Sequence, residues 1–70
     1  MKVELFDRIV DVKELKLGTV VFLVHNEDDP ETWFPAHVTG FPNNSAMKNV
    51  GIMVNGVFVY YVNIAWNNEE

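Results

Sequence analysis

The sequence predicts an all-β chain that folds as a small SH3-like antiparallel barrel with a short N-terminal arm or helical turn. Three observations lead to this fold class: four or five short runs of β-forming residues, two medium-length polar loops, and a tight Asn55-Gly56 hairpin. Several short strands separated by turn signals are typical of small barrels. An open meander packed on an N-terminal helix is the alternative architecture.

The N-terminal region is expected to form an arm and one helical turn. Residues 3–6 (VELF) favour a short strand or arm. Residues 11–14 (DVKE) place an acid three residues after a capping residue, the capping-box pattern, and so predict a helical turn. Leu15 and Leu17 then fold back on the core. A helix over residues 6–17 is the alternative. It is not preferred, because the apolar residues of this segment fit a 3.6-residue period only in part.

Two strands are expected in the middle of the chain. Gly18 ends the preceding turn, and residues 19–25 (TVVFLVH) form a run that is apolar on both alternating faces. Residues 26–32 (NEDDPET) form an acidic loop, and residues 33–41 form the next strand. Pro35 lacks an N–H and so belongs at an edge or at the start of that strand. One face of this strand carries Phe34, Ala36 and Val38, and the other carries Trp33, His37, Thr39 and Phe41.

The hairpin of residues 50–62 is apolar on both faces. A two-residue Asn55-Gly56 turn places Val54 opposite Val57 and sets the register of the two strands. One face then carries Val50, Ile52, Val54, Val57, Val59 and Tyr61, and the other carries Met53, Phe58, Tyr60 and Val62. Because a small sheet has one core, the second face requires a partner.

The remaining segments complete one domain over residues 1–70. Residues 42–48 are expected to form a second loop, residues 62–66 a turn and a short closing strand, and residues 67–70 a frayed tail. A domain this short is marginally stable and usually needs disulfides, a metal or oligomerisation. Since the chain has no cysteine, a homo-oligomer is expected.

The charge of the chain favours small or protein partners over extended nucleic acid. The formal net charge is −5, and five Lys and Arg residues are too few to neutralise a long run of phosphates. A small anionic ligand such as a free nucleotide needs only two or three donors, which copies of Lys48 or Arg8 in an oligomer would supply. Neither a signal peptide nor a membrane-spanning run is visible, so a cytoplasmic location and no membrane partner are expected.

Three strand segments follow one another in a recognisable order: residues 18–22 (GTVVF), 35–39 (PAHVT) and 49–54 (NVGIMV). This order resembles a group of small phage-encoded proteins, which run G-x-x-V, then P-A-x-V-T, then V-N-L-x-V, and end in a strand with a Trp. The resemblance extends to Trp66, and the chain departs from it in loop 43–48 and in its N-terminal extension. It implies an SH3-like barrel of viral origin without established enzyme activity, in a class whose members often block or sequester components of host defence.

No catalytic or metal-binding motif stands out. His25 and His37 would need a third ligand from the acidic residues 27–29, and their spacing matches no zinc pattern, so structural histidines are expected. Ser45 has no base near it in the sequence. The acidic loop lacks the alternating ligands and glycine of a calcium loop, and no glycine-rich phosphate loop is present. The sequence therefore predicts no enzyme activity, no metal and no cofactor.

Aromatic residues exceed what a core of this size needs and supply the candidate binding site. Phe34, Val59 and Tyr61 are assigned to the core or to a homo-oligomer interface. The Trp and Tyr rings outside it can stack on an aromatic ligand or a base, while Asn and Thr side chains hydrogen-bond to its edges. The candidate ligand- or partner-binding residues are Trp33, His37, Thr39, Asn49, Phe58, Tyr60, Asn63 and Trp66.

Two functions fit these observations. The first is a non-enzymatic, phage-encoded binding protein, a homo-oligomer that sequesters a small nucleotide-like ligand or blocks a host defence protein in the host cytoplasm. The alternative is a structural or adaptor subunit of a virion or a larger complex that docks through its apolar face. An enzyme would be compatible with the sequence only if a metal were bound.

Overall fold

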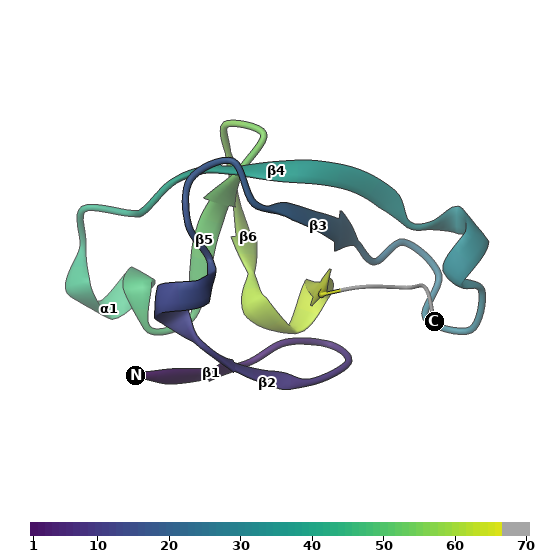
Figure 1. The fold of residues 1–70 in the computed structure, drawn as a ribbon, viewed down its shortest axis with the longest axis horizontal. Coiled ribbons are helices and arrows are strands. Elements are labelled where there is room, and N and C mark those ends of the chain that lie inside the picture. Colours follow the sequence, from purple (N-terminus) through teal and green to yellow (C-terminus); the bar gives the residue numbers. More distant parts are fainter. Residues whose placement is uncertain (67–70) are drawn as a thin grey trace.

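The computed structural model describes residues 1–66, and its main feature is a five-stranded antiparallel sheet that curls into a small barrel (Figure 1). The strand order is β6-β5-β4-β3-β7, so that β7 returns to lie beside β3. This connectivity is that of an SH3-like barrel, which confirms the predicted fold class. The predicted tail over residues 67–70 lies outside the described residues. The strands of the sheet are β3 (Val20–Leu23), β4 (Phe34–Gly40), β5 (Gly51–Val54), β6 (Val57–Tyr60) and β7 (Ile64–Ala65).

Strand β4 is shared by the two halves of the barrel. Its residues 34–37 lie opposite β3, whereas Val38 and Gly40 lie opposite β5 across a shift in register. A strand that changes neighbour part-way along its length lets the sheet bend over itself. Pro35 is the second residue of β4, in the half that has β3 but not β5 beside it. Its missing N–H therefore falls at the start of the strand, as expected.

The N-terminal region forms a hairpin and a 3-10 turn, so the alternative of a helix over residues 6–17 is wrong. Val3 and Val10 are buried between exposed or half-buried neighbours, the two-residue period of strands with one covered face. The turn predicted after Asp11 is present: Asp11 Oδ1 accepts a hydrogen bond from Lys13 N at 3.0 Å, which lowers the pKa of the Asp11 carboxyl. The elements are β1 (Lys2–Glu4), β2 (Ile9–Asp11) and η1 (Val12–Glu14).

Leu15 and Leu17 have opposite environments, although both were expected in the core. Leu15 is fully buried, but Leu17 is 65% exposed, which corrects the prediction. The reason is a tight turn in which Thr19 N donates to Lys16 O at 3.0 Å. Gly18, with φ at +87°, supplies the left-handed conformation that this turn requires, and Leu17 is left at its tip.

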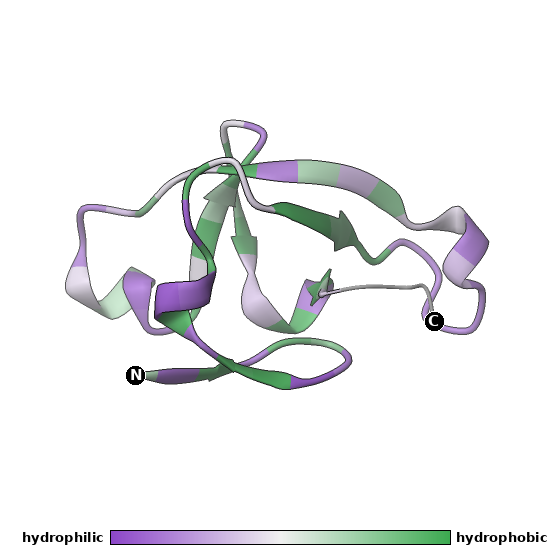
Figure 2. Cartoon of the chain, in the orientation of Figure 1, coloured by the Kyte–Doolittle hydropathy of each residue, from purple (hydrophilic) through white to green (hydrophobic). Residues whose placement is uncertain are grey.

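The N-terminal hairpin closes one end of the barrel. Phe6 N donates to Ile64 O at 2.8 Å, and Trp66 N donates to Asp7 Oδ1 at 3.0 Å, so the hairpin loop is fastened to β7 and the residue that follows it. Strands β2, β3 and β5 are mainly hydrophobic (Figure 2). Apart from the Tyr61 hydroxyl, no polar or charged side chain is buried within residues 1–66. The core cluster consists of Val3, Leu5, Val10, Leu15, Val21, Ala36, Val38, Ile52, Val54, Tyr61 and Ile64.

The β5–β6 hairpin has the predicted register and is fastened to β4. Asn55 and Gly56 have φ values of +52° and +80°, the left-handed pair of a type I′ turn. Asn55 N donates to His37 O at 3.0 Å, and His37 N donates to Asn55 Oδ1 at 3.1 Å. Gly56 N donates to Thr39 Oγ1 at 2.9 Å. These bonds hold the turn beside β4, although Asn55 and Gly56 are themselves exposed.

The two faces of the hairpin are covered to different degrees. On the predicted core face Ile52, Val54 and Tyr61 are buried and Val59 packs against the core. Val50 and Val57 of that face are exposed, because they lie at the ends of the hairpin. On the second face Met53 and Phe58 are half-buried, whereas Tyr60 and Val62 are exposed. The second face is thus apolar and largely uncovered within the chain.

Phe34 does not belong to the core of the chain, so of the two places expected for it only a homo-oligomer interface is left, as a prediction. It is 60% exposed because it is the first residue of β4 and pairs with Leu23 at the end of β3, at the rim of the barrel.

Both loops contain a short helical turn. Asp29 Oδ1 accepts from Glu31 N at 3.2 Å in the acidic loop. Asn44 Oδ1 accepts from Ala46 N at 2.8 Å in the second loop, which was expected to be irregular. The Asn-Ser start of that turn is an N-cap signal that was visible in the sequence. The remaining elements are η2 (Pro30–Thr32), α1 (Ser45–Lys48) and η3 (Tyr61–Asn63).

We expect Gly51→Ala to destabilise the barrel, whereas Gly40→Ala does not. A Cβ at Gly51 would clash with Val59 O and lie 2.6 Å from the Phe58 ring, while a Cβ at Gly40 meets nothing within 4 Å. The clash should lower the free energy of unfolding by about 1–3 kcal/mol, as overpacking does. Urea unfolding measures both variants, and equal stability of the two would contradict the close approach.

Candidate ligand-binding site

Trp33, the first of the predicted binding residues, has a structural role. Its Nε1 donates to Asn26 O at 2.8 Å, which closes the acidic loop on itself. Its ring meets Phe6 edge-on, with the centroids 5.4 Å apart and the planes at 85°. Such a pair contributes about 0.5–1.5 kcal/mol beyond the burial of area. The indole therefore joins the acidic loop to the N-terminal hairpin.

His37 and Thr39 also serve the fold. Both bond to the Asn55-Gly56 turn, His37 through its backbone and Thr39 through its hydroxyl oxygen. The two residues lie beside the turn and line neither of the hollows described below.

The other predicted residues lie on the hairpin and near the C-terminal end of the described chain. Phe58 and Tyr60 form an edge-on ring pair with centroids 5.4 Å apart on the outer face of β6. Asn63 ends η3 and accepts from Val24 N through its carbonyl at 2.9 Å. Trp66 is half-buried against the core. Asn49 and Asn63 thus both lie outside the strands. The eight predicted residues do not form one site.

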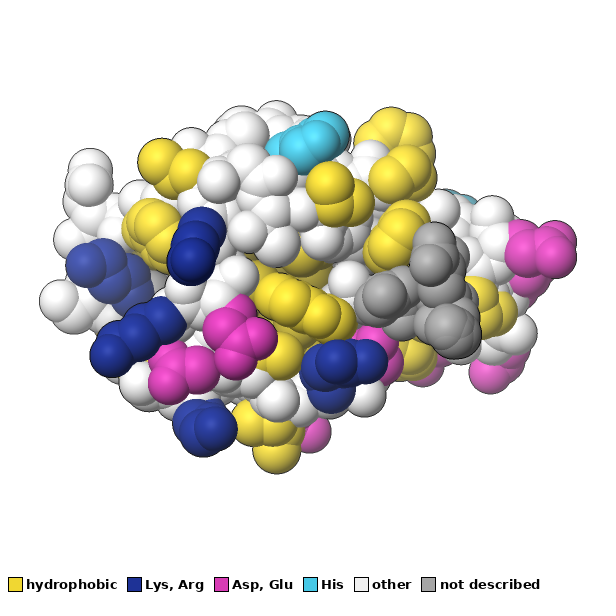
Figure 3. All heavy atoms as spheres, viewed as in Figure 1, with side chains coloured by type: hydrophobic (Ala, Val, Ile, Leu, Met, Phe, Trp, Pro, Cys, Tyr) yellow, Lys and Arg dark blue, Asp and Glu magenta, His cyan; other side chains and the backbone are white. Residues whose placement is uncertain are grey.

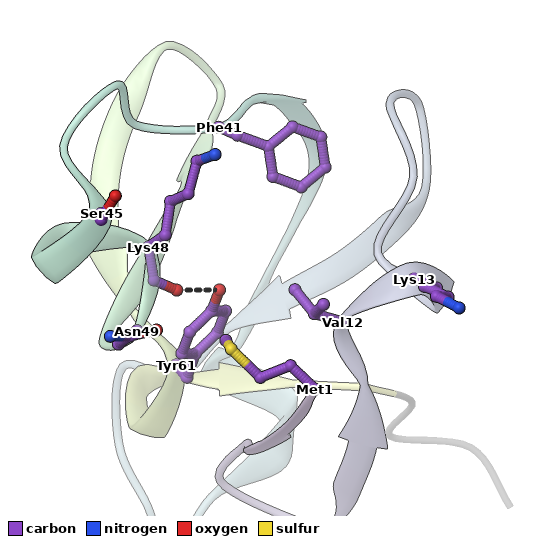
Figure 4. A pocket seen from close by; sticks show the side chains of 8 residues that line it. All are labelled: Met1, Val12, Lys13, Phe41, Ser45, Lys48, Asn49 and Tyr61. Atoms are coloured by element: carbon purple, nitrogen blue, oxygen red, sulfur yellow. Dashed lines mark hydrogen bonds between the residues drawn. The ribbon is translucent and has the colours of Figure 1, made fainter.

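A pocket of about 520 Å³ lies where α1, η1 and the N-terminal strand meet (Figure 4). Of the predicted residues only Asn49 belongs to it, and Lys48 was named as an anion donor. No sequence motif links the other residues, since they come from segments distant in sequence. The lining residues are Met1, Val12, Lys13, Phe41, Ser45, Lys48, Asn49 and Tyr61.

The walls of the pocket are mostly apolar, with a cation at the rim. In Figure 4 the side chains of Met1, Val12 and Tyr61 line its lower part, and Lys48 extends from α1 toward the Phe41 ring. Lys13 belongs to the lining, but its side chain points away from the others. The lining includes no Asp or Glu, so the ammonium group of Lys48 has no carboxylate beside it within the pocket.

Tyr61 joins the pocket to the core. Its side chain is only 4% exposed, and its hydroxyl donates to Lys48 O at 2.8 Å. Burial raises the pKa of the Tyr61 phenol, because the charged phenolate loses its hydration there. The hydroxyl therefore stays neutral and fixes the end of α1, and with it the position from which Lys48 starts.

A second, smaller hollow of about 350 Å³ borders the first. It contains Glu4 as well as Tyr60 and Val62, and it shares Asn49 and Tyr61 with the larger pocket. The carboxylate of Glu4 makes this hollow unfavourable for an anion.

The charges of the protein are unevenly distributed. Lys and Arg side chains gather on the side that carries α1 and the N-terminus (Figure 3). The acidic loop lies at the opposite end of the long axis. The pocket is thus on the more basic side of a chain whose net charge is −5.

The described part of the chain, residues 1–66, holds neither a metal-binding cluster nor a helix of membrane-spanning length. Across residues 1–66 no three His, Cys, Asp or Glu side chains come together as a metal site. In that same part of the chain no helix has the length and apolar character needed to cross a bilayer. Comparison with protein-family models, curated proteins and solved structures gave no significant match.

Replacing the hydroxyl of Tyr61 should weaken the barrel and loosen α1. We expect Tyr61→Phe to lower the free energy of unfolding by about 1 kcal/mol, because Lys48 O loses its donor. Tyr60→Phe, which removes the same group from an exposed ring, is the matched control and should change little. Urea unfolding followed by tryptophan fluorescence measures both, and equal losses would contradict the role of this hydrogen bond.

The raised pKa of Tyr61 predicts that the protein loses stability at alkaline pH. The folded-state pKa of Tyr61 is raised above its ordinary value of 10.0. Its contribution is therefore fully present below pH 10.0 and is lost as the pH rises through the folded-state pKa. Unfolding measured over an alkaline pH series should show this loss in the wild type and a smaller one in Tyr61→Phe. Parallel curves for the two proteins would refute the assignment.

Proposed function

We propose that this protein is a non-enzymatic binding protein that takes a small ligand with an apolar or aromatic body and one anionic group. The observation that carries the proposal is the pocket between α1 and η1, with Tyr61 and Val12 as apolar walls and Lys48 at the rim. Its volume of about 520 Å³ is typical of small-molecule sites. Such sites combine apolar walls with a few placed polar groups.

The preference for an anion rests on local charge. Lys48 extends over the pocket and the lining contains no acid, in a chain with twice as many acidic as basic residues. A charged hydrogen bond from Lys48 to a carboxylate or phosphate contributes about 1.5–3 kcal/mol. Ser45 and Asn49 add a hydroxyl and an amide at the same wall. A nucleotide belongs to this ligand class, since its base can stack on a ring such as Phe41.

The biological setting of the proposal comes from the sequence. The resemblance to small phage-encoded proteins supports a viral protein that sequesters a small ligand, or blocks a defence protein, in the cytoplasm of its host. Sequestration requires only that the ligand be held in the pocket. Assembly into a homo-oligomer remains part of the proposal.

A second candidate function is that of a structural or adaptor subunit. The outer face of the β5–β6 hairpin favours it, because Tyr60 and Val62 are exposed beside the half-buried Phe58. The two functions differ in their response to small ligands. A ligand that binds only the folded state raises the melting temperature, whereas a docking subunit requires its protein partner.

Lys48→Gln should weaken the binding of anionic ligands about tenfold or more, because one charged hydrogen bond is lost. The probes are AMP and 1-naphthoate, with adenosine and 1-naphthol as their uncharged counterparts. Amide chemical shifts in ¹H–¹⁵N spectra report both affinity and place. We expect at least one anion to shift amides along the pocket, including those of Phe41 and Asn49, more strongly than its uncharged counterpart does.

Lys16→Gln is the control, because it removes a lysine that does not line the pocket. It should leave the affinity unchanged. Shifts centred elsewhere, equal affinity of Lys48→Gln and wild type, or silence with all four probes at millimolar concentration would each overturn the proposed ligand class.

A further inference from the structure

Strand β6 is an open edge of the five-stranded sheet. In a two-residue hairpin the residues that flank the turn exchange hydrogen bonds, and the pairs then alternate along the strands. Tyr61 N donates to Val50 O at 2.9 Å, which continues this alternation. The N–H and C=O groups of Phe58 and Tyr60 therefore point away from β5. Among residues 1–66 neither residue has a backbone partner beyond the strand pairing with β5.

This edge lacks the features that normally prevent strands from pairing between molecules. Edge strands are usually protected by a charged side chain, a proline, a bulge or a covering segment. The β6 sequence VFVY contains neither charge nor proline, and its register with β5 is regular. Val57 and Tyr60 are both exposed, so the strand is uncovered at each end.

The charge distribution favours a second copy of this chain as the occupant of the edge. No Asp, Glu, Lys, Arg or His lies between Asn49 and Trp66. Two chains of net charge −5 repel each other wherever their acidic surfaces meet, and pairing through the uncharged hairpin keeps those surfaces apart. Strand β6 itself offers a strongly charged partner no complementary side chain.

We propose that two copies pair through β6, antiparallel and related by a two-fold axis at Val59. In this register Phe58 of each copy lies opposite the partner's Tyr60, and the outward backbone groups form four N–H···O=C bonds. A two-fold axis at Phe58 would bring the Asn55-Gly56 turn into the strand pairing, and an axis at Tyr60 would bring η3 into it. Either axis would therefore give fewer hydrogen bonds between the two strands. A symmetric contact of this kind closes as a dimer.

The side chains reinforce the same register. Phe58 and Tyr60 already form a pair within one copy, so the dimer places four rings on one face of a continuous sheet. Cross-strand aromatic pairs contribute about 0.2–1 kcal/mol each. On the other face Val59 meets the partner's Val59. The contact is smaller than a standard interface of about 800 Å² per partner, so the dimer should dissociate on dilution.

Sedimentation velocity from about 1 µM to about 1 mM tests the dimer, since small interfaces dissociate in this range. Tyr60→Lys places a charge on the edge and should abolish the dimer. Val20→Lys is the matched control: Val20 is 50% exposed against 54% for Tyr60, but it lies on β3, which has β4 and β7 on its two sides. The Val20→Lys variant should still form the dimer, and circular dichroism verifies that both variants fold.

Hydrogen exchange locates the contact. At concentrations where the dimer forms, the amides of Phe58 and Tyr60 should become protected, and they should exchange freely in dilute solution. A chemically synthesised chain with an N-methylated Phe58 amide keeps every side chain but loses one outward donor on each copy, so it should dimerise more weakly. A monomer at all concentrations, a dimer that survives Tyr60→Lys, or a dimer in which these amides stay unprotected would overturn the proposal. The pocket plays no part in it.

Discussion

Three hydrogen bonds fasten the Asn55-Gly56 turn to β4, and the arrangement of the barrel follows from them. The left-handed turn fixes the register of β5 and β6, and a slip of one residue would exchange the two faces of both strands. The observed register directs Ile52 into the core and Phe58 outward. It also delivers Tyr61 to the floor of the pocket, immediately after β6 ends. Core, pocket and open edge are thus set by one local conformation.

The pocket is a by-product of how so short a chain closes its barrel. The N-terminal hairpin covers one end of the sheet, and α1 projects beside it from the loop between β4 and β5. The two segments meet over the Tyr61 ring but do not fill the space between them, which leaves a hollow with apolar walls. Because Tyr61 O–H holds the end of α1, the same residue supports the fold and limits the depth of the hollow.

Local signals predicted the barrel well, and the site poorly. The register of the hairpin and the turn after Asp11 depend on neighbouring residues, so the sequence alone sufficed for both. The sequence left open whether Phe34 enters the core or an interface, because exposure at a barrel rim depends on which distant segment covers the residue. The surplus of aromatic residues selected Trp33, whose N–H and ring are already bonded to the acidic loop and the N-terminal hairpin. The pocket joins Val12 to Lys48 across the fold, and no motif spans that distance.

The Asn55-Gly56 turn also bears on the chemical ageing of the protein. Asn-Gly is the dipeptide most prone to cyclise to a succinimide, through attack of the glycine nitrogen on the asparagine side chain. In the folded chain the Gly56 N–H is bonded to Thr39 and the Asn55 carboxamide oxygen to His37, so neither reacting group is free to move toward the other. Deamidation of Asn55 then requires the turn to open. Its rate is therefore set by how often the hairpin separates from β4.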